Sequence, residues 1–148
     1  MIDNNNLHEI KLYAKKSYPN ECCGFLLGTN TSEKKVVKVC PVKNTNMDRT
    51  HDRFSIDGRD FAKIDREAAK KGLQIIGIYH SHPDHPAAPS AFDTENAWVG
   101  YSYVIAAVEK GEVVDIKSWV FDEKAKQFEQ ETVSSVRESG EYTQGVRV

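Results

Sequence analysis

The sequence predicts one α/β domain in which helices flank a mixed β-sheet. Two patterns of apolar residues at helical spacing lie in the first half of the chain. A continuous apolar run at 73–79 is typical of a central strand that is covered on both faces. Three further apolar segments, separated by short charged turns, favour an antiparallel meander in the last third. Helices between the early strands and consecutive late strands together indicate a mixed sheet.

The first element is expected to be a helix. The residues that recur at helical spacing are Leu7, Ile10 and Ala14. Pro19 ends this pattern, and a strand is expected to begin near Glu21. Residues 23–28 form a short apolar run bounded by glycine, which predicts that this strand is buried. The segment 36–42 is its expected partner.

The next segment is expected to contain a short strand and a helix. Phe54 and Ile56 suggest the strand, and Asp57 can then cap a helix that ends at Gly72. The residues of this helix that are expected to face inward are Phe61, Ile64 and Ala68.

The apolar run at 73–79 is expected to form a central strand, with His80 at its end. Residues 83–89 include three prolines and are therefore expected to form a loop. A short helix from Ser90 to about Trp98 should follow. The three strands of the meander are expected at 101–108, 113–121 and 127–133.

Composition indicates a single globular domain. The chain has 148 residues, of which 39% are hydrophobic and 28% are charged, an ordinary balance for a protein that folds alone. We expect the domain to span 1–133 and a polar, mobile tail to span 134–148. The net charge of -2 argues against binding of the whole domain to nucleic acid or to an anionic membrane.

A cytoplasmic location is expected. The longest apolar stretches, such as 103–108, are far shorter than the roughly 20 residues that cross a bilayer, and the first residues lack the pattern of a secretory signal. Cys22, Cys23 and Cys40 are odd in number and two of them are adjacent, so we expect three free thiols and no disulfide framework.

The chemically informative residues are His80-Ser81-His82, followed within one short window by Ser90 and Asp93. Side chains alternate along an extended segment, so His80 and His82 can direct both imidazoles the same way. Asp93 lies in the first turn of the following helix and can return to the strand end. Two histidines and one carboxylate are a recurrent catalytic zinc set that leaves one position for water. We therefore expect one zinc ion per chain.

Zinc-assisted hydrolysis also needs a proton acceptor and a donor to the developing oxyanion. Glu21 precedes a buried strand and can approach the metal from a neighbouring strand, so it is the candidate general base and then general acid. Ser90 is the candidate hydrogen-bond donor to the oxyanion. From its position alone Glu21 could equally be a surface carboxylate, and its role depends on the resemblance that follows.

Glu21, His80-Ser81-His82, Ser90 and Asp93 together reproduce the pattern of the JAMM (MPN-plus) metallopeptidases, a glutamate followed by HSHx7SxxD. The chain resembles this family from about residue 5 to residue 120. The resemblance implies a deaminase-like α/β sandwich, zinc held by His80, His82 and Asp93, and hydrolysis of an amide or isopeptide bond.

The family resemblance also implies a substrate. Family members remove ubiquitin or ubiquitin-like modifiers, and short prokaryotic members resemble enzymes that trim the C-terminus of ubiquitin-like sulfur-carrier proteins. The implied partner is therefore the tail of a ubiquitin-like or sulfur-carrier protein. A scaffold or modifier-binding module of the same fold, without catalysis, is the main alternative.

Structural interpretations compete with these roles. Ser90 and Asp93 have the spacing of a capping box, and we expect capping and metal binding to place the carboxylate differently. His85 is expected at the rim of the site, and His8 and His51 are expected to be exposed.

Three other chemical interpretations are weaker. A thiol hydrolase based on Cys22 or Cys23 lacks a nearby positive charge to stabilise the thiolate. Base deamination would require His-x-Glu and Pro-Cys-x-x-Cys elements, which the sequence lacks. A purely structural zinc site normally has four protein ligands, and only three can be named.

Overall fold

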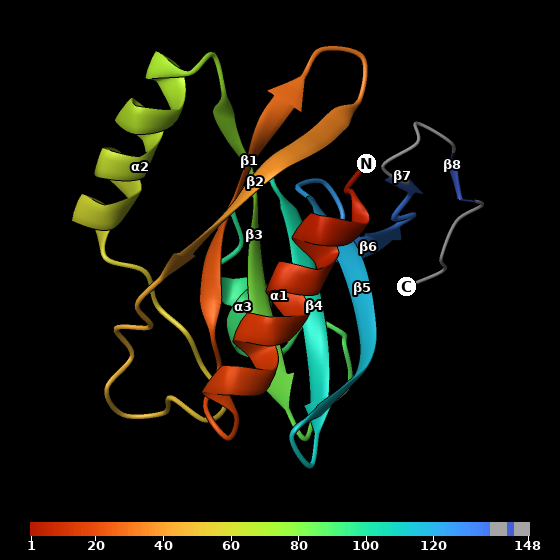
Figure 1. Ribbon diagram of the computed structural model, residues 1–148. Coiled ribbons are helices and arrows are strands. Elements are labelled where there is room, and N and C mark those ends of the chain that lie inside the picture. Colours follow the sequence, from red (N-terminus) through yellow and green to blue (C-terminus); the bar gives the residue numbers. More distant parts are fainter. Residues whose placement is uncertain (137–141, 144–148) are drawn as a thin grey trace.

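The computed structural model describes residues 1–136 and 142–143 and is built on a six-stranded sheet (Figure 1). The strand order is β2-β1-β3-β4-β5-β6, and β7 pairs with β8 in a separate small sheet. The strands are β1 (Cys23–Asn30), β2 (Lys34–Val42), β3 (Gln74–Pro83), β4 (Ser102–Glu109), β5 (Glu112–Asp122), β6 (Gln127–Glu131), β7 (Ser135–Val136) and β8 (Tyr142–Thr143). The helices are α1 (Asn4–Ser17), α2 (Gly58–Lys70) and α3 (Ala91–Glu95).

Part of the predicted tail lies outside the described residues. These are 137–141 and 144–148. The domain boundary at 133 therefore stays a prediction. No helix among the described residues is long and apolar enough to cross a membrane.

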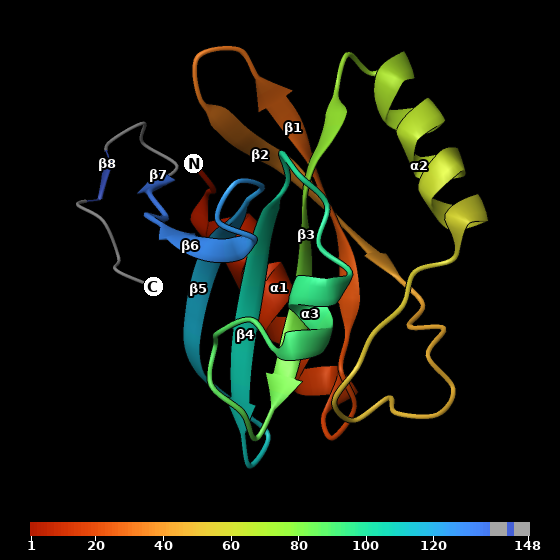
Figure 2. The same cartoon turned by 180° about the vertical axis from the view of Figure 1, so that it is seen from behind.

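The sheet is mixed, as predicted. All neighbouring strands pair antiparallel except β3 and β4, which are parallel. A parallel pair requires a crossover connection over one face of the sheet. The connection between β3 and β4 carries α3, which lies against the face turned to the viewer in Figure 2. The chain therefore passes over this face of the sheet on its way from β3 to β4.

Helix α1 covers the opposite face of the sheet (Figure 1). The Asp3 carboxylate caps its first turn by accepting a hydrogen bond from the Asn6 backbone N–H at 2.7 Å. The predicted inward residues, Leu7, Ile10 and Ala14, are all buried. The helix ends before Pro19, so the predicted helix and its end are confirmed.

Helix α2 packs on the same face as α3. Asp57 caps it by accepting from the Arg59 N–H at 2.8 Å, and Gly72 follows its end at a φ of 70°, where side chains are strained. The predicted inward residues pack with Phe25 and Ile78 in one apolar cluster. These residues are Phe61, Ile64 and Ala68. The predicted helix and both of its ends are confirmed.

Strand β3 is longer than predicted. It lies between β1 and β4 and continues to Pro83, so His80 lies inside the strand and does not end it. The extra residues pair in parallel with β4, where His82 lies opposite Ala107 and Pro83 opposite Val108. His80 is therefore paired with strands on both sides, and His82 is paired with β4 alone.

The strand predicted around Phe54 and Ile56 does not form. The chain from 43 to 57 is irregular. Ser55, between the two apolar residues, donates its backbone N–H to the side-chain oxygen of Asn44 at 3.1 Å. Its carbonyl accepts from the Thr45 backbone N–H at 2.9 Å. Because a side chain satisfies the backbone donor, the segment needs no partner strand.

Candidate metal centre

His80 and His82 occupy alternate positions on β3, so both imidazoles lie on the sheet face that α3 covers. Cys23 of β1 is opposite His80 on one side, and Ile105 of β4 is opposite it on the other. The His80 side chain is fully buried, and that of His82 is nearly so. Their Nε2 atoms lie 3.1 Å apart. Regular strand geometry therefore forms the predicted imidazole pair.

Asp93 reaches both histidines with a single oxygen. Its Oδ2 lies 3.2 Å from Nε2 of His80 and 3.2 Å from Nε2 of His82. The same oxygen accepts a hydrogen bond from the Ser90 backbone N–H at 2.9 Å, and the Ser90 hydroxyl accepts one from the Asp93 backbone N–H at 3.1 Å. The capping box and the approach to the histidines coexist. The expectation that they place the carboxylate differently is wrong.

The three donor atoms fit a tetrahedral zinc ion. They form a nearly equilateral triangle with separations of 3.1, 3.2 and 3.2 Å. Donors about 2.0–2.1 Å from a tetrahedral centre lie about 3.3 Å from one another. Imidazole nitrogen and carboxylate oxygen are among the ligands that zinc prefers, and catalytic zinc sites use three protein ligands. The number, type and spacing of the donors therefore match a catalytic zinc site.

Glu21 lies beside this triangle, directly before β1. Its Oε1 is 3.8 Å from Nε2 of His82, and one atom each of Glu21, His80 and His82 lie within 4.8 Å of one another. Both of its carboxylate oxygens are buried without a hydrogen-bond partner among the described residues. A buried carboxyl group that lacks partners is costly. Because Asp93 approaches His82 more closely, Glu21 is better placed to act on a group bound at the triangle.

Burial and neighbouring charges set the protonation states at the site. Burial, and then the charges of Asp93 and Asp52, raise the pKa of Glu21 to about 9. Complete burial lowers the pKa of His80 and keeps its ring neutral. Burial alone would raise the pKa of Asp93, but His80, His82 and the Ser90 N–H together hold it well below its usual range. A neutral imidazole and an ionised carboxylate are the forms that bind metals.

The Pro86 carbonyl fixes the tautomer of His82. Nδ1 of His82 lies 2.8 Å from this oxygen, which can only accept, so Nδ1 carries the hydrogen and donates it. Nε2 of His82 then carries no hydrogen, and its lone pair is available to bind a metal ion at the centre of the triangle. Nδ1 of His80 is buried without a partner among the described residues.

Sequence reasoning missed two residues that shape the site. The Phe54 ring stacks on the His80 ring, with 4.4 Å between centroids and 27° between planes. The Asn44 side-chain amide donates to the carbonyls of Glu21 at 3.2 Å and Arg53 at 2.9 Å, which ties the irregular segment to the start of β1. Asparagine is common in turns, but that signal alone does not identify its partners.

A cleft of about 490 Å³ opens beside the triangle, and it is here called the polar cleft after the charged side chains that line it among apolar ones. Its lining residues are Glu21, Arg49, Asp52, Arg53, His82, Pro83, His85, Pro86, Ala88, Pro89, Ser90, Ala91 and Phe92. His85 is exposed at its rim, as expected, and His8 and His51 are also exposed. The polar cleft gives a substrate access to Glu21 and Ser90.

The cysteines give the rival thiol mechanism no support. Burial raises the pKa of both Cys22 and Cys23, which disfavours the reactive thiolate. The Cys23 sulfur lies 3.8 Å from the Val42 carbonyl oxygen. All three cysteines, including Cys40, are free thiols as predicted.

Comparison with known families identifies the family of this chain. Residues 4–122 match the family described as prokaryotic homologs of the JAB domain. The chain belongs to this family. The JAMM resemblance seen in the sequence motif is thereby confirmed, and the JAB-domain match includes all of the predicted site residues.

Three proteins from other organisms are similar to this JAB-family chain. Desampylase from Pyrococcus furiosus is 34% identical over 72% of this chain and 70% of its own length. Desampylase from Haloferax volcanii is 33% identical over 60% of this chain and 63% of its own length. The probable TtuB-protein conjugate cleaving protease from Thermus thermophilus is 29% identical over 67% of this chain and 64% of its own length. The chain thus spans about two thirds of these relatives.

Solved structures support the predicted fold. A protein from Desulfitobacterium hafniense has a TM-score of 0.77 at 28% identity, covering 93% of this chain and 91% of its own. A protein from Salinibacter ruber has a TM-score of 0.71 at 33% identity, covering 97% and 95%. A structure described as JAMM, a metalloprotease-like zinc site in the proteasome and signalosome, has a TM-score of 0.56 at 17% identity, covering 91% and 95%. The last of these shows the fold alone.

Proposed function

We propose that this protein is a zinc-dependent peptidase of the JAMM type that cleaves a peptide or isopeptide bond at the C-terminus of a ubiquitin-like or sulfur-carrier protein. The observation that carries the proposal is the buried triangle of three metal donors beside the unpartnered carboxylate of Glu21. The substrate class is supported by the names of the relatives, which include two desampylases and a conjugate-cleaving protease.

In this proposal His80, His82 and Asp93 hold one zinc ion per chain. Zinc in a site with three protein ligands lowers the pKa of a water ligand to about 7 and polarises a carbonyl group. The Ser90 backbone N–H orients the Asp93 carboxylate, and the Pro86 carbonyl orients the His82 ring. These two contacts hold the donors in place and limit the rearrangement that metal binding requires.

Glu21 is proposed to move the proton. It accepts a proton from the attacking water as the water oxygen bonds to the carbonyl carbon. It then donates that proton to the leaving nitrogen as the C–N bond breaks, which yields a carboxylic acid and an amine. A carboxyl group that acts first as base and then as acid needs a pKa near the working pH. Burial raises the pKa of Glu21 to about 9 in the metal-free protein, and a cation held by the neighbouring histidines and Asp93 would lower it toward neutrality.

Ser90 is proposed to stabilise the oxyanion. Its hydroxyl oxygen already accepts a hydrogen bond from the Asp93 backbone N–H. A hydroxyl has one hydrogen to donate, and no acceptor for that of Ser90 is found in the part of the chain that the structure describes. The hydrogen is therefore free to contact the substrate oxygen as it becomes negative. The position of Ser90 in the lining of the polar cleft supports this role.

The test is hydrolysis of ubiquitin-like proteins extended past a terminal Gly-Gly. The purified protein should contain about one zinc per chain, and a chelator should abolish cleavage until zinc is restored. Glu21→Ala should abolish cleavage, with Glu9→Ala on the exposed surface of α1 as the matched control. Cleavage by Glu21→Ala at the wild-type rate would remove the general base from the proposal.

The same assay separates the proposal from the scaffold alternative. A scaffold would bind its ubiquitin-like partner equally well with and without metal and would cleave none of the extended proteins. The proposed enzyme requires the metal for turnover, so chelation should affect cleavage far more than binding. Metal-independent binding without any cleavage would establish the scaffold.

A further inference from the structure

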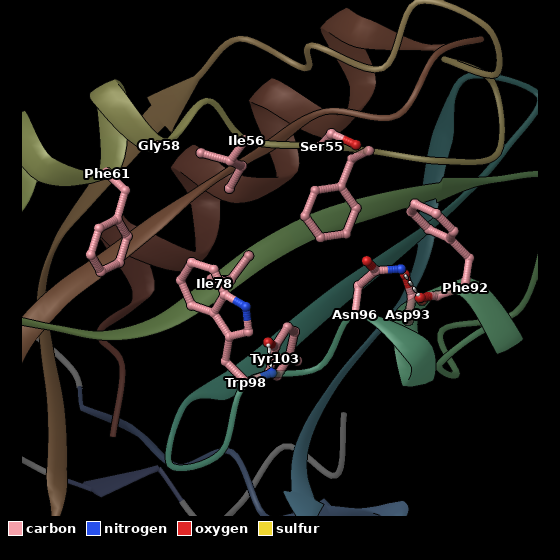
Figure 3. A pocket seen from close by; sticks show the side chains of 11 residues that line it. Ser55, Ile56, Gly58, Phe61, Ile78, Phe92, Asp93, Asn96, Trp98 and Tyr103 are labelled. Carbon is pink, nitrogen blue, oxygen red and sulfur yellow. Dashed lines mark hydrogen bonds between the residues drawn. The ribbon is translucent and has the colours of Figure 1, made fainter.

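An apolar pocket of about 290 Å³ lies next to the metal centre (Figure 3). Ile78 of β3 lines it, two residues before His80 and on the same face of the sheet. The aromatic rings that surround it belong to Phe54, Phe61, Phe92, Trp98 and Tyr103. Apolar cavities of about 150 Å³ admit benzene. This pocket is therefore large enough for one large apolar side chain.

Hydrogen bonds and ring contacts hold the walls of this apolar pocket in place. The Trp98 backbone N–H donates to the Tyr103 hydroxyl at 2.7 Å, and the Asn96 side chain donates to the Phe92 carbonyl at 2.8 Å. The Trp98 and Phe61 rings meet edge to face, with 5.3 Å between centroids. The Trp98 side chain is 45% exposed, so an incoming group can reach its ring. The walls of the pocket are therefore fixed by contacts within the protein, and the pocket is open to solvent at Trp98.

The apolar pocket and the polar cleft lie on different sides of the site. Asp93 lines the apolar pocket, whereas Glu21 and His82 line the polar cleft. Phe92 lines both cavities, so they adjoin at this residue. A substrate that crosses the metal centre therefore meets charged groups on one side and aromatic rings on the other.

We propose that the apolar pocket binds a large apolar side chain of the substrate tail, on the acyl side of the scissile bond. The inference rests on the proposed function, because the position of the proton donor sets the direction of the chain. Glu21 gives its proton to the leaving nitrogen and lines the polar cleft. The leaving group therefore departs through the polar cleft, and the acyl portion extends past Asp93 into the apolar pocket.

The spacing along β3 sets which substrate residue reaches the pocket. An extended chain advances about 3.3 Å per residue, so the two residues from Ile78 to His80 span about 7 Å. A terminal Gly-Gly covers the same length and has no side chains to fill the pocket. The side chain immediately before the two glycines, or the one before that, reaches it. The predicted substrate class is a tail with a large apolar residue at one of the two positions that precede Gly-Gly.

The test uses fusion substrates that differ at one position. A ubiquitin-like protein with the tail X-Gly-Gly, followed by a leaving peptide, is prepared with X as Leu, Phe, Ser or Asp, and a second series moves X one residue upstream. In one series kcat/KM should be at least about tenfold higher for Leu and Phe than for Ser and Asp. Trp98→Ala should reduce this ratio to about threefold or less. Val99→Ala, an exposed neighbour outside the pocket lining, should keep it.

The outcomes separate this inference from the proposed function. Equal cleavage of all tails, with zinc dependence intact, overturns the pocket assignment and leaves the hydrolase standing. Absence of cleavage for every tail overturns the proposed function, and calorimetric titration of the same fusions then tests the pocket alone. Binding that favours Leu and Phe and depends on Trp98 supports the pocket. Binding that does not depend on X overturns it.

Discussion

The Ser90 backbone N–H donates to the same Asp93 oxygen that lies 3.2 Å from both imidazoles. One carboxylate oxygen therefore completes the helix cap and faces the two candidate zinc-binding histidines. The Ser90 hydroxyl is a separate part of this arrangement, because it accepts from the Asp93 N–H. Substitutions at the two residues should consequently separate capping, metal binding and turnover.

Ser90→Ala should keep zinc near one ion per chain while turnover falls about 100- to 1000-fold, the usual effect of losing an oxyanion donor. The backbone N–H that orients Asp93 is unchanged, but loss of the cap should lower stability by about 1 kcal/mol. Metal analysis and kcat measurements check this, with Ser90→Thr as the variant that keeps a hydroxyl. Loss of zinc in parallel with activity would assign Ser90 to metal retention instead.

Asp93→Asn should lower zinc affinity by more than the roughly 10- to 100-fold cost of removing an outer-shell partner. The amide oxygen can still accept from the Ser90 N–H, so the Tm of the metal-free variant should stay within about 3 °C of that of the metal-free wild type. Asp93→Ala removes both contacts and should lower that Tm further. Zinc titration and thermal unfolding provide the readouts. Full zinc affinity in Asp93→Asn would exclude the carboxylate as a ligand.

Metal-free protein should lose stability as pH rises from about 7 to 8.5, above the range in which His80 titrates in the unfolded state. The folded-state pKa of Glu21 is raised from 4.5 to about 9, so below pH 4.5 the carboxyl is protonated in both states. Between these values only the unfolded state releases the proton, which costs up to about 1.4 kcal/mol per pH unit. Urea unfolding of chelated Glu21→Gln should show a flatter pH dependence, whereas Glu9→Gln should match wild type. Equal slopes in all three proteins would contradict the prediction.

Cys22→Ser and Cys23→Ser should each keep at least about half of the wild-type activity, because burial raises the pKa of both thiols. Iodoacetamide at pH 7 should react slowly with these two residues, as mass spectrometry of the modified peptides would measure. Inactivation of Cys22→Ser with its zinc still bound would restore the thiol mechanism.

Gly24→Ala should destabilise the protein by about 1–3 kcal/mol and reduce activity. A Cβ at this position in β1 would overlap the Tyr79 ring and the Cys40 carbonyl oxygen, so the strand that follows Glu21 must shift. Gly58→Ala is the matched control, because nothing lies within 4 Å of its Cβ. It should be neutral or should stabilise α2 by up to about 1 kcal/mol. Equal stability of the two variants in urea unfolding would disagree with the close packing at Gly24.

Local patterns predicted most of the secondary structure. Leu7, Ile10 and Ala14 identified α1, and Asp57 with Gly72 identified both ends of α2. These signals depend on neighbouring residues, and tertiary contacts did not override them. The strand predicted from Phe54 and Ile56 was wrong, because alternation over so few residues does not distinguish a strand from a loop that a distant side chain stabilises. In this case that side chain is Asn44.

The candidate site was predictable to the extent that its spacing is local. His80, His82 and Asp93 lie in one window, and strand alternation with a helix start brings them together. Glu21 depended on family resemblance, since its approach results from pairing of β1 with β3. The stacking of Phe54 on His80 and the aromatic walls around Trp98 join segments far apart in the chain, and periodicity carries no information about such contacts.

The candidate zinc donors and the proposed general base depend on different parts of the fold. The three candidate zinc donors belong to β3 and the crossover that follows it, so closing this short stretch around an ion would cost little chain entropy. Glu21, the proposed general base, instead depends on the alignment of a different, antiparallel strand. A mutation that shifts the register of β1 by one residue would thus yield a protein that binds its ion but is inactive. Metal content by itself is therefore a poor assay for correctly folded enzyme.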